Sequence, residues 1–332
     1  MVAGRSALLH CRIVTCTCTV LTVHNLGSIN VDHVYRVPHL VRPGETLSSR
    51  ALETVLGGKG ANQSVALARA GATVRHVGRV GNADDWARDA LARAGVDVSA
   101  VASVDGPSGH AIIQVDEAGE NAIVLHGGAN HTLDEAAVKA ALEPAGRGEA
   151  LLLQNETSGI EAAFAVALSR GLRVAFNPAP MSEAIARLPL ERCETLILNE
   201  TEATMLAAAD GTGPEHGGGT PQAIDDLEAR LVSRYPDVRL VLTLGGRGAR
   251  LRHGDARARV PAFDVRALDT TGAGDTFVGY LLAALEAGID ERAALERACA
   301  AAALSVTVAG ATPSIPDAAA VDAFLATESR PS

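Results

Sequence analysis

The sequence predicts an α/β fold: a mostly parallel sheet with helices on both faces, plus a small antiparallel β lid. Short β-rich runs alternate with alanine-rich amphipathic runs, and this succession is typical of a parallel sheet covered on both faces. Hydrophobic residues make up 47% of the chain and charged residues 20%, as in an ordinary globular protein. At roughly 150 residues per domain, 332 residues allow two domains, or one large domain with an insertion.

The expected elements follow one another in a regular order. Strands are predicted at residues 19–26, 74–77, 150–154, 172–176, 195–198 and 240–244. Helices are predicted at residues 61–70, 84–94, 160–170, 201–208 and 222–234, and the final third adds 275–287, 291–308 and 317–327. Asp84 and Asp85 mark one helix start, because acids suit the positive end of a helix. The glycine-rich segment 211–220 is expected to be a surface loop.

Two stretches, residues 31–56 and 109–126, interrupt the alternation, because they contain β-like runs with no helix between them. The second forms a plausible hairpin around Gly119. We interpret both stretches as a lid inserted into one α/β domain that covers residues 19–330. Such a lid would cover the carboxyl end of the sheet, where folds of this class bind ligands.

Charge and composition exclude two classes of protein. The 29 basic and 39 acidic residues give a net charge of −10, and only 3% of residues are aromatic, so nucleic-acid binding is not expected. The basic residues include only two lysines, Lys59 and Lys139. A P-loop requires Ser or Thr after Gly-Lys, whereas Gly60 follows Lys59. If the protein binds ATP, it does so without a Walker lysine.

The cysteines and the first residues indicate a soluble, reduced, cytoplasmic protein. Five cysteines without Cys-x-x-Cys spacing do not suggest a disulfide framework, and His10, Cys11, Cys16 and Cys18 lack the spacing of a zinc site. Residues 1–18 contain Arg12 and other polar residues that interrupt a signal-peptide core, so they are expected to be an extension of doubtful relevance. No apolar run approaches the ~20 residues that a membrane span needs.

The most informative motif is the segment 269–277, Asp-Thr-Thr-Gly-Ala-Gly-Asp-Thr-Phe, which precedes a predicted helix. Gly272, Ala273 and Gly274 let a ligand approach backbone amides that have no partner at a helix start, so they favour an anion site. Asp275 is open to two interpretations. It could be an N-cap, or it could take a proton from an incoming hydroxyl beside the bound phosphate.

Two further clusters suit a polar ligand. The segment 57–62, Gly-Gly-Lys-Gly-Ala-Asn, enters a helix, but Gln63 stands where a dinucleotide motif needs glycine. Asn62 and the glycine amides are better suited to ligand hydroxyls. Asn30 and Asp32 point to the same side if the chain is extended, and such a pair can bind sugar hydroxyls. A pair of Asx turns is the alternative.

Two weaker motifs complete the set. In Asn199-Glu-Thr-Glu202, the acids could hold a magnesium ion through water, or they could form a solvated helix start. The segment 243–248 resembles a strand-turn-strand hairpin, whose glycines either line a nucleotide site or only turn the chain.

Together these motifs resemble the ribokinase branch of the PfkB carbohydrate kinase family, in order and spacing, over residues 19–327. The pairing of Asn30-x-Asp32 with Gly-Gly-Lys-Gly-Ala-Asn resembles ribokinases more than fructokinases or adenosine kinases. The resemblance implies a ribokinase-like fold and ATP-dependent phosphorylation of D-ribose at its 5-hydroxyl. A kinase for 2-deoxyribose, another pentose or a nucleoside is the alternative. A non-catalytic sugar-binding regulator is disfavoured, because a sensor needs neither Asp275 nor an anion hole.

The resemblance also implies a role for each matching residue. Asp275 would be the general base, and Gly272, Ala273 and Gly274 the anion hole. Besides Asp275, ribose would contact Asn30, Asp32, Gly58, Lys59, Asn62 and Glu156. ATP would contact Asn199, Thr243, Gly245, Gly246, Gly248 and Gly274, with Cys299 near the adenine at a position where the ribokinase compared has His. Glu202 would organise Mg²⁺ through water, and K⁺ would lie beside Asp269, Thr271, Ser305, Val308, Gly310 and Ser314. The resemblance further implies a homodimer formed through the lid.

Overall fold

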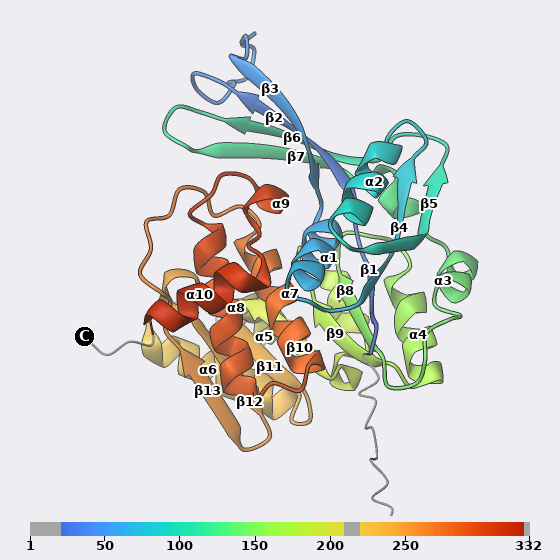
Figure 1. The fold of residues 1–332 in the computed structure, drawn as a ribbon, viewed down its shortest axis with the longest axis vertical. Helices are drawn as coiled ribbons and strands as arrows, with labels where there is room; N and C mark the ends of the chain where they lie inside the picture. Colours follow the sequence, from blue (N-terminus) through green and yellow to red (C-terminus); the bar gives the residue numbers. More distant parts are fainter. Residues whose placement is uncertain (1–20, 209–219, 329–332) are drawn as a thin grey trace, which may run out of the picture.

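The computed structural model describes residues 21–208 and 220–328. The expected extension at 1–18, with Cys11, Cys16 and Cys18, and residues 211–219 of the expected loop lie outside these ranges. The described chain forms a large sheet with helices on both faces, and a second, smaller sheet projects from one end of it (Figure 1). The predicted fold class is confirmed.

The large sheet has nine strands in the order β13-β12-β11-β10-β9-β8-β1-β4-β5. The run from β5 to β11 is parallel throughout, whereas β12 and β13 are antiparallel at one edge. All six predicted strands are present, β12 is the second strand of the expected hairpin at 243–248, and β5 and β13 were not predicted. The strands are β1 Val23–Leu26, β4 Val74–Gly81, β5 Asp97–Val104, β8 Ala150–Gln154, β9 Arg173–Asn177, β10 Thr195–Asn199, β11 Arg239–Thr243, β12 Ala249–His253 and β13 Ala256–Val260.

Helices cover both faces because the central strands bury apolar side chains in both directions. Leu152 points into a core formed with α1, α2, α7 and α8, whereas its neighbours Leu151 and Leu153 point into a core formed with α3, α4, α5 and α6. Among residues 21–208 and 220–328, no helix is long and apolar enough to cross a membrane. The helices are α1 Lys59–Arg69, α2 Asp85–Arg93, α3 Glu135–Ala141, α4 Ile160–Arg170, α5 Glu200–Ala208, α6 Pro221–Arg234, α7 Ala273–Glu286, α8 Glu291–Ser305, α9 Ala311–Ser314 and α10 Ala318–Glu328.

The smaller sheet, hereafter the lid, has the strand order β3-β2-β6-β7. Its strands are β2 Asn30–Arg36, β3 Ala51–Gly57, β6 Gly109–Val115 and β7 Asn121–His126. Each of the two predicted stretches forms an antiparallel hairpin, as expected. The two hairpins join through β2 and β6, which run parallel, so the expectation of an entirely antiparallel lid is wrong at this central pair. The lid lies above one end of the large sheet (Figure 1).

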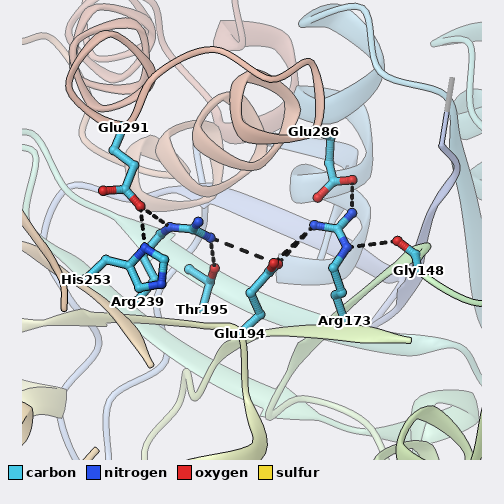
Figure 2. A network of polar contacts seen from close by, with 8 residues as sticks. All are labelled: Gly148, Arg173, Glu194, Thr195, Arg239, His253, Glu286 and Glu291. Atoms are coloured by element: carbon cyan, nitrogen blue, oxygen red, sulfur yellow. Dashed lines mark hydrogen bonds and ion pairs between the residues drawn. The ribbon is translucent and has the colours of Figure 1, made fainter. Parts of the chain in front are cut away.

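An ion-pair network joins α7 and α8 to the amino ends of three parallel strands (Figure 2). Arg239 at the start of β11 donates through Nε to Glu291 at 2.8 Å, and Arg173 at the start of β9 pairs with Glu286 at the end of α7. Glu194, just before β10, accepts from Arg173 Nη1 at 3.1 Å. These contacts fix the end of α7 and the start of α8 at the amino ends of the strands, so the first turn of α7 points toward the carboxyl ends.

Candidate active site

Three cavities surround the loop and first turn that begin α7, and the central one lies at the carboxyl ends of β9, β10 and β11. The central one, of about 170 Å³, is lined by Lys59, Glu202 and Asp275 among others. A cavity of about 380 Å³ between the β11–β12 turn and the α7–α8 pair shares Gly274 with it. A third, of about 640 Å³, lies beneath the lid and includes Asp32. Ligands of parallel α/β sheets bind at this edge.

Asp275 lies inside the first turn of α7. The helix begins at Ala273, two residues earlier than predicted, because Gly272 adopts a φ of 76° as its N-cap. The Asp275 carboxylate does not cap the helix: it accepts hydrogen bonds from Asn62 Nδ2 at 3.0 Å and Gln63 Nε2 at 2.9 Å. The N-cap interpretation is therefore wrong. Burial raises the pKa of Asp275, against the opposing effects of the Lys59 ammonium and the two donated hydrogen bonds.

The start of α7 leaves its backbone open to the cavities. Gly274 lines both the central cavity and the neighbouring one, and a Cβ at this position would meet no atom within 4 Å. At Gly272, a Cβ would lie 3.0 Å from the Cα of Ala311, so this turn also needs glycine for space. Ala273 completes the turn. The predicted anion site is thus a helix start whose first turn faces the cavities.

Lys59 and Glu156 come from two different elements and meet beside the central cavity. Lys59 begins α1, and Glu156 follows β8. Glu156 Oε2 accepts from Ser28 Oγ at 2.7 Å and from the Lys59 amide at 3.0 Å, while Lys59 Nζ lies 3.4 Å from Glu156 Oε1. Burial opposes the charge of Lys59, but the Asp275 and Glu156 carboxylates outweigh it and raise the pKa of Lys59. The ammonium therefore stays charged between two carboxylates.

Asn30 and Asp32 lie on the same face of β2, as predicted from their spacing. Both belong to a strand paired on both sides, so the alternative of Asx turns is wrong. Asn30 Oδ1 accepts from Asn130 Nδ2 at 2.8 Å. Asp32 Oδ1 is buried and has no hydrogen-bond partner among the described residues. Burial, then the Glu156 charge, raises the pKa of Asp32 to about 7, against the effect of Lys59. An unpartnered buried carboxylate oxygen suits a ligand hydroxyl.

Gly57 and Gly58 explain why this turn is rich in glycine. A Cβ at Gly57 would lie 1.9 Å from Asp32 Oδ2, so the Asp32 carboxylate occupies the space that a side chain at position 57 would need. Gly58 adopts a φ of 91° where the chain turns from β3 into α1. The turn therefore places Lys59 at the central cavity, Asn62 within hydrogen-bond distance of Asp275, and the Asp32 carboxylate against the backbone of Gly57.

The cavity beside the β11–β12 turn has mainly apolar walls. Thr243, Gly245, Gly246 and Gly248 line one side, and Cys299 of α8 lines the other. The expected hairpin is present, and its glycines do more than turn the chain because they also form this wall. Burial raises the pKa of the Cys299 thiol to about 12, so it is a neutral part of the wall. Such a cavity suits a flat aromatic base.

Asn199 and Glu202 hold each other in a reciprocal pair. The Asn199 amide donates to Glu202 Oε2 at 2.9 Å, and the Glu202 amide donates to Asn199 Oδ1 at 2.8 Å. Glu202 is buried, so the alternative of a solvated helix start is wrong, and burial raises its pKa. No group of three or more His, Cys, Asp or Glu side chains is arranged to hold a metal within residues 21–208 and 220–328. The oxygen donors of Glu202 suit Mg²⁺ only through bridging water.

Asp269 fixes the loop that precedes α7. Its Oδ1 accepts from the Thr271 amide at 2.9 Å and from Thr271 Oγ1 at 2.7 Å, and its Oδ2 accepts from the Gly310 amide at 2.8 Å. Burial would raise the pKa of Asp269, but these donated hydrogen bonds outweigh it and lower the pKa. Asp269, Thr271 and Gly310 line the cavity beneath the lid.

The other three residues expected around K⁺ do not line that cavity. Ser305 ends α8 and donates its hydroxyl to the Ala302 carbonyl, and Ser314 ends α9 and donates to the Ala311 carbonyl. Val308 is exposed. The structure thus brings together Asp269, Thr271 and Gly310, whereas Ser305 lies at the end of α8, Val308 in the turn that follows and Ser314 at the end of α9.

Several residues at the site were not predicted. Gln63 and Asn177 make a 3.1 Å hydrogen bond beside Asp275, and Thr312 Oγ1 donates to Asn62 Oδ1 at 2.7 Å. Asn177 could have been predicted as a site residue, because it is a polar residue at the carboxyl end of a parallel strand, where ligands bind. Gln63 follows Asn62 directly in the chain, but the sequence pattern indicates only that it breaks a dinucleotide motif, so its contact with Asp275 was not predicted.

The chain is similar to known carbohydrate kinases over most of its length. Residues 22–318 match the pfkB family of carbohydrate kinases. The chain is 38% identical to the ribokinase of Haemophilus influenzae over 303 residues, which are 89% of this chain and 95% of that protein. It is similar in structure to the ribokinase of Cryptococcus neoformans var. grubii serotype A in complex with ADP, with a TM-score of 0.79, 34% identity and 91% and 99% of the two chains covered. For the Arabidopsis thaliana ribokinase complexed with ribose and ATP, the TM-score is 0.77 at 29% identity, over 92% and 99% of the two chains.

Proposed function

The chain belongs to the pfkB family of carbohydrate kinases, and we propose that it transfers the γ-phosphoryl group of ATP to the 5-hydroxyl of D-ribose. The observation that carries this proposal is the placement of Asp275. Its carboxylate lies in the first turn of α7, on the central cavity between the sugar-side residues and the nucleotide-side cavity. A general base is needed at that point, next to the amides that would face the transferred group.

In the proposed reaction, the 5-hydroxyl oxygen bonds to the γ-phosphorus, and its proton passes to the Asp275 carboxylate. The bond from the γ-phosphorus to the bridging oxygen breaks, and ADP leaves with that electron pair. Gly272, Ala273 and Gly274 would stabilise the charge on the phosphoryl oxygens through backbone amides. Lys59 would add a fixed positive charge, since its ammonium already acts on Asp275. No Walker lysine is needed for this chemistry.

The sugar would bind under the lid beside Glu156. Asp32 offers a buried carboxylate oxygen that has no partner among the described residues. Asn62, in the first turn of α1, donates to Asp275 and lies on the same side of the site. The remaining sugar contacts would be Asn30, Gly58, Lys59 and Glu156. Short polar groups of this kind recognise hydroxyls by hydrogen bonds, and the closeness of the lid would exclude water.

ATP would bind with its base in the apolar cavity and its phosphates toward α7. Asn199 and Thr243 line the central cavity on the phosphate side, and Gly245, Gly246 and Gly248 form a wall of the apolar cavity. Cys299 would contact the base side through its neutral thiol. Glu202 faces the central cavity and would orient water molecules around Mg²⁺, which when bound neutralises charge on the phosphates.

A monovalent cation would bind beside Asp269. Carboxylate, hydroxyl and carbonyl oxygens are the donors that K⁺ prefers, and Thr271 and Gly310 already surround this carboxylate. Ser305, Val308 and Ser314 would add oxygens if the segment from the end of α8 to α9 closes on the ion. Bound there, K⁺ would order the loop that leads into the first turn of α7.

The lid would also form a homodimer with a second copy of the chain. On the lid face opposite the cavity that contains Asp32, Leu52 of β3, Ile112 of β6 and Val124 of β7 are 53%, 42% and 68% exposed. Exposed apolar side chains that share one face of a sheet indicate a protein interface. Light scattering on wild type and on Val124→Glu tests this: a dimer that becomes a monomer supports it, and a wild-type monomer contradicts it.

The proposed activity is tested by ADP release with ribose, 2-deoxyribose, fructose and adenosine as acceptors. Ribose is expected to give the highest kcat/KM, and a preference for another acceptor would reassign the substrate. Binding of ribose without ADP release would favour the non-catalytic regulator instead. Because the reaction consumes ATP and Cys193 and Cys299 are free thiols, we place the enzyme in the cytoplasm.

A further inference from the structure

A chain of buried amide side chains lies behind Asp275. Asn25 of β1, Gln154 of β8 and Gln63 of α1 follow one another by hydrogen bonds, and we call these three residues the amide relay. All three are 0% exposed. An amide can present either its NH₂ or its oxygen to a neighbour, so the direction of each member matters.

The direction of the first relay member is fixed by a backbone carbonyl. Asn25 Nδ2 donates to the Gly60 carbonyl at 2.8 Å, and a carbonyl can only accept, so Asn25 must turn Oδ1 toward Gln154. Gln154 Nε2 then donates to Asn25 Oδ1 at 2.9 Å and to Gln63 Oε1 at 2.7 Å. Gln154 therefore forces Gln63 to turn its NH₂ group the other way.

A second backbone carbonyl fixes the far end. Asn177 Nδ2 donates to the Ile197 carbonyl at 2.9 Å, which turns Asn177 Oδ1 toward Gln63. Gln63 Nε2 uses its two hydrogens on Asn177 Oδ1 at 3.1 Å and on Asp275 Oδ1 at 2.9 Å. Both ends thus demand the same orientation of Gln63, the one that donates to the carboxylate.

We propose that Gln63 is a positioning residue for the reaction described above, and that the amide relay fixes its direction so that it donates to Asp275. The inference rests on the proposed function of Asp275. Asn62 holds Oδ2 and Gln63 holds Oδ1, so the plane of the carboxylate is set from both oxygens. Gln154 does not contact Asp275 and acts through Gln63: its NH₂ group binds Gln63 Oε1 and leaves Gln63 Nε2 to face Asp275.

Three charged groups also act on Asp275, and a test of the amide relay must leave them unchanged. Lys59 favours its ionised form, whereas Glu156 disfavours it, and Glu202 and Asp275 also repel each other. The relay variants leave all three in place. A change in the ionisation of Asp275 is therefore due to the loss of the Gln63 amide in Gln63→Met, and to a changed orientation of that amide in Gln154→Met.

The experiment compares Gln63→Met and Gln154→Met, which keep side-chain length but cannot donate, with Gln222→Met on exposed α6 as the matched control. We expect kcat with ribose to fall about tenfold in Gln63→Met, since a hydrogen bond to a charged group is lost, with KM nearly unchanged. Gln154→Met should lower kcat in the same direction, and in both variants the acidic limb of the kcat profile should move to higher pH.

A readout without substrate separates this inference from the proposed function. The ¹³C carboxyl resonance of Asp275, identified by its absence in Asp275→Asn, is titrated in folded wild type and variants. A higher pKa of Asp275 in both relay variants supports the relay even if no sugar is phosphorylated. Folded variants with wild-type carboxyl titration overturn it, including the case in which only their melting temperatures fall. If Gln154→Met does not fold, Gln63→Met alone decides.

Discussion

Glu156 contacts Lys59 at both ends of the lysine: Oε2 accepts from the backbone amide at 3.0 Å, and Oε1 lies 3.4 Å from Nζ. One carboxylate therefore fixes the first residue of α1 and the position of the ammonium beside Asp275. Glu156 also accepts from Ser28 Oγ, so it joins the turn after β1 to the start of α1. A single carboxylate links three segments of the sugar side.

We expect Glu156→Gln to raise the KM for ribose about tenfold, with a smaller effect on kcat. A glutamine keeps the size but weakens the charged hydrogen bonds to Ser28 and Lys59. Glu161→Gln, on the exposed start of α4, is the matched control. Steady-state kinetics with varied ribose measures both, and an unchanged KM in Glu156→Gln would show that this carboxylate does not shape the sugar side.

Ribose binding should depend on pH through Asp32, because its pKa is about 7. Protonation removes hydrogen-bond acceptors, so the KM for ribose should rise about tenfold between pH 8 and pH 6. Asp32→Asn should bind ribose weakly and without this pH dependence. A wild-type KM that is flat over this range would rule out the shifted carboxylate.

The same group should affect stability in a definite direction. The folded pKa of Asp32 is about 7 and the ordinary value is 3.8, so the unfolded chain loses the proton at lower pH than the folded protein. The free energy of unfolding therefore falls as pH rises from about 4 to about 7 through this group. Thermal melts should show that Asp32→Asn stabilises the protein more at pH 8 than at pH 5; the reverse order would contradict the assigned shift.

Asp275→Asn should fold normally, bind ribose and lose about a thousandfold in kcat, the range expected for removal of a general base. Asp226→Asn on exposed α6 is a control with the same chemical change. ADP release gives kcat, and calorimetry gives the ribose affinity. Turnover near that of wild type would remove Asp275 from the proposed mechanism.

K⁺ should activate the enzyme more than Na⁺, because the loop before α7 is held through Asp269 and the larger ion suits several oxygen donors at once. Asp269→Ala should abolish the difference and also lower activity, since the contacts to Thr271 and Gly310 are lost. ADP release is measured in each salt at equal ionic strength. Equal wild-type rates in the two salts would refute the cation site.

Gly279→Ala should reduce both stability and kcat, because a Cβ there would lie 2.4 Å from the Ala66 Cβ and force α7 away from α1. Those helices hold Asp275 and its donor Asn62, so their separation would disturb the base. We expect a loss of about 1–3 kcal/mol in the free energy of unfolding. Gly146→Ala, where a Cβ would meet its nearest atom at 3.5 Å, is the control, and denaturant melts of both variants decide.

The sequence predicted the site best where glycine turns enter helices. Lys59, Asn62 and Asp275 lie in two such turns; the structure brings Lys59 and Asp275 to one cavity and Asn62 into a hydrogen bond with Asp275. The alternation of strands and helices was enough for the parallel sheet, because it is local in the chain. The start of α7 at Ala273 was missed because it depends on the backbone conformation of Gly272.

Other features depend on contacts that no local pattern specifies. Asn25, Gln154 and Asn177 lie in buried strands, where a single amide looks like an exception in an apolar run until its partner is known. Gln63 and Asp275 are 212 positions apart in the chain, yet they are joined by a hydrogen bond. The parallel pairing of β2 with β6 is likewise a contact between separate insertions.

The lid also has a consequence for how the chain folds. Its two hairpins leave the α/β domain at separate points and meet through β2 and β6, whose paired residues Asn30 and Gly109 are far apart in sequence. Loop closure over such a separation is slow compared with hairpin formation. Asp32 is paired with Val55 and Ala111, so its final environment exists only after both hairpins have joined. The capacity to bind sugar should therefore arise in refolding only after the two hairpins of the lid have joined.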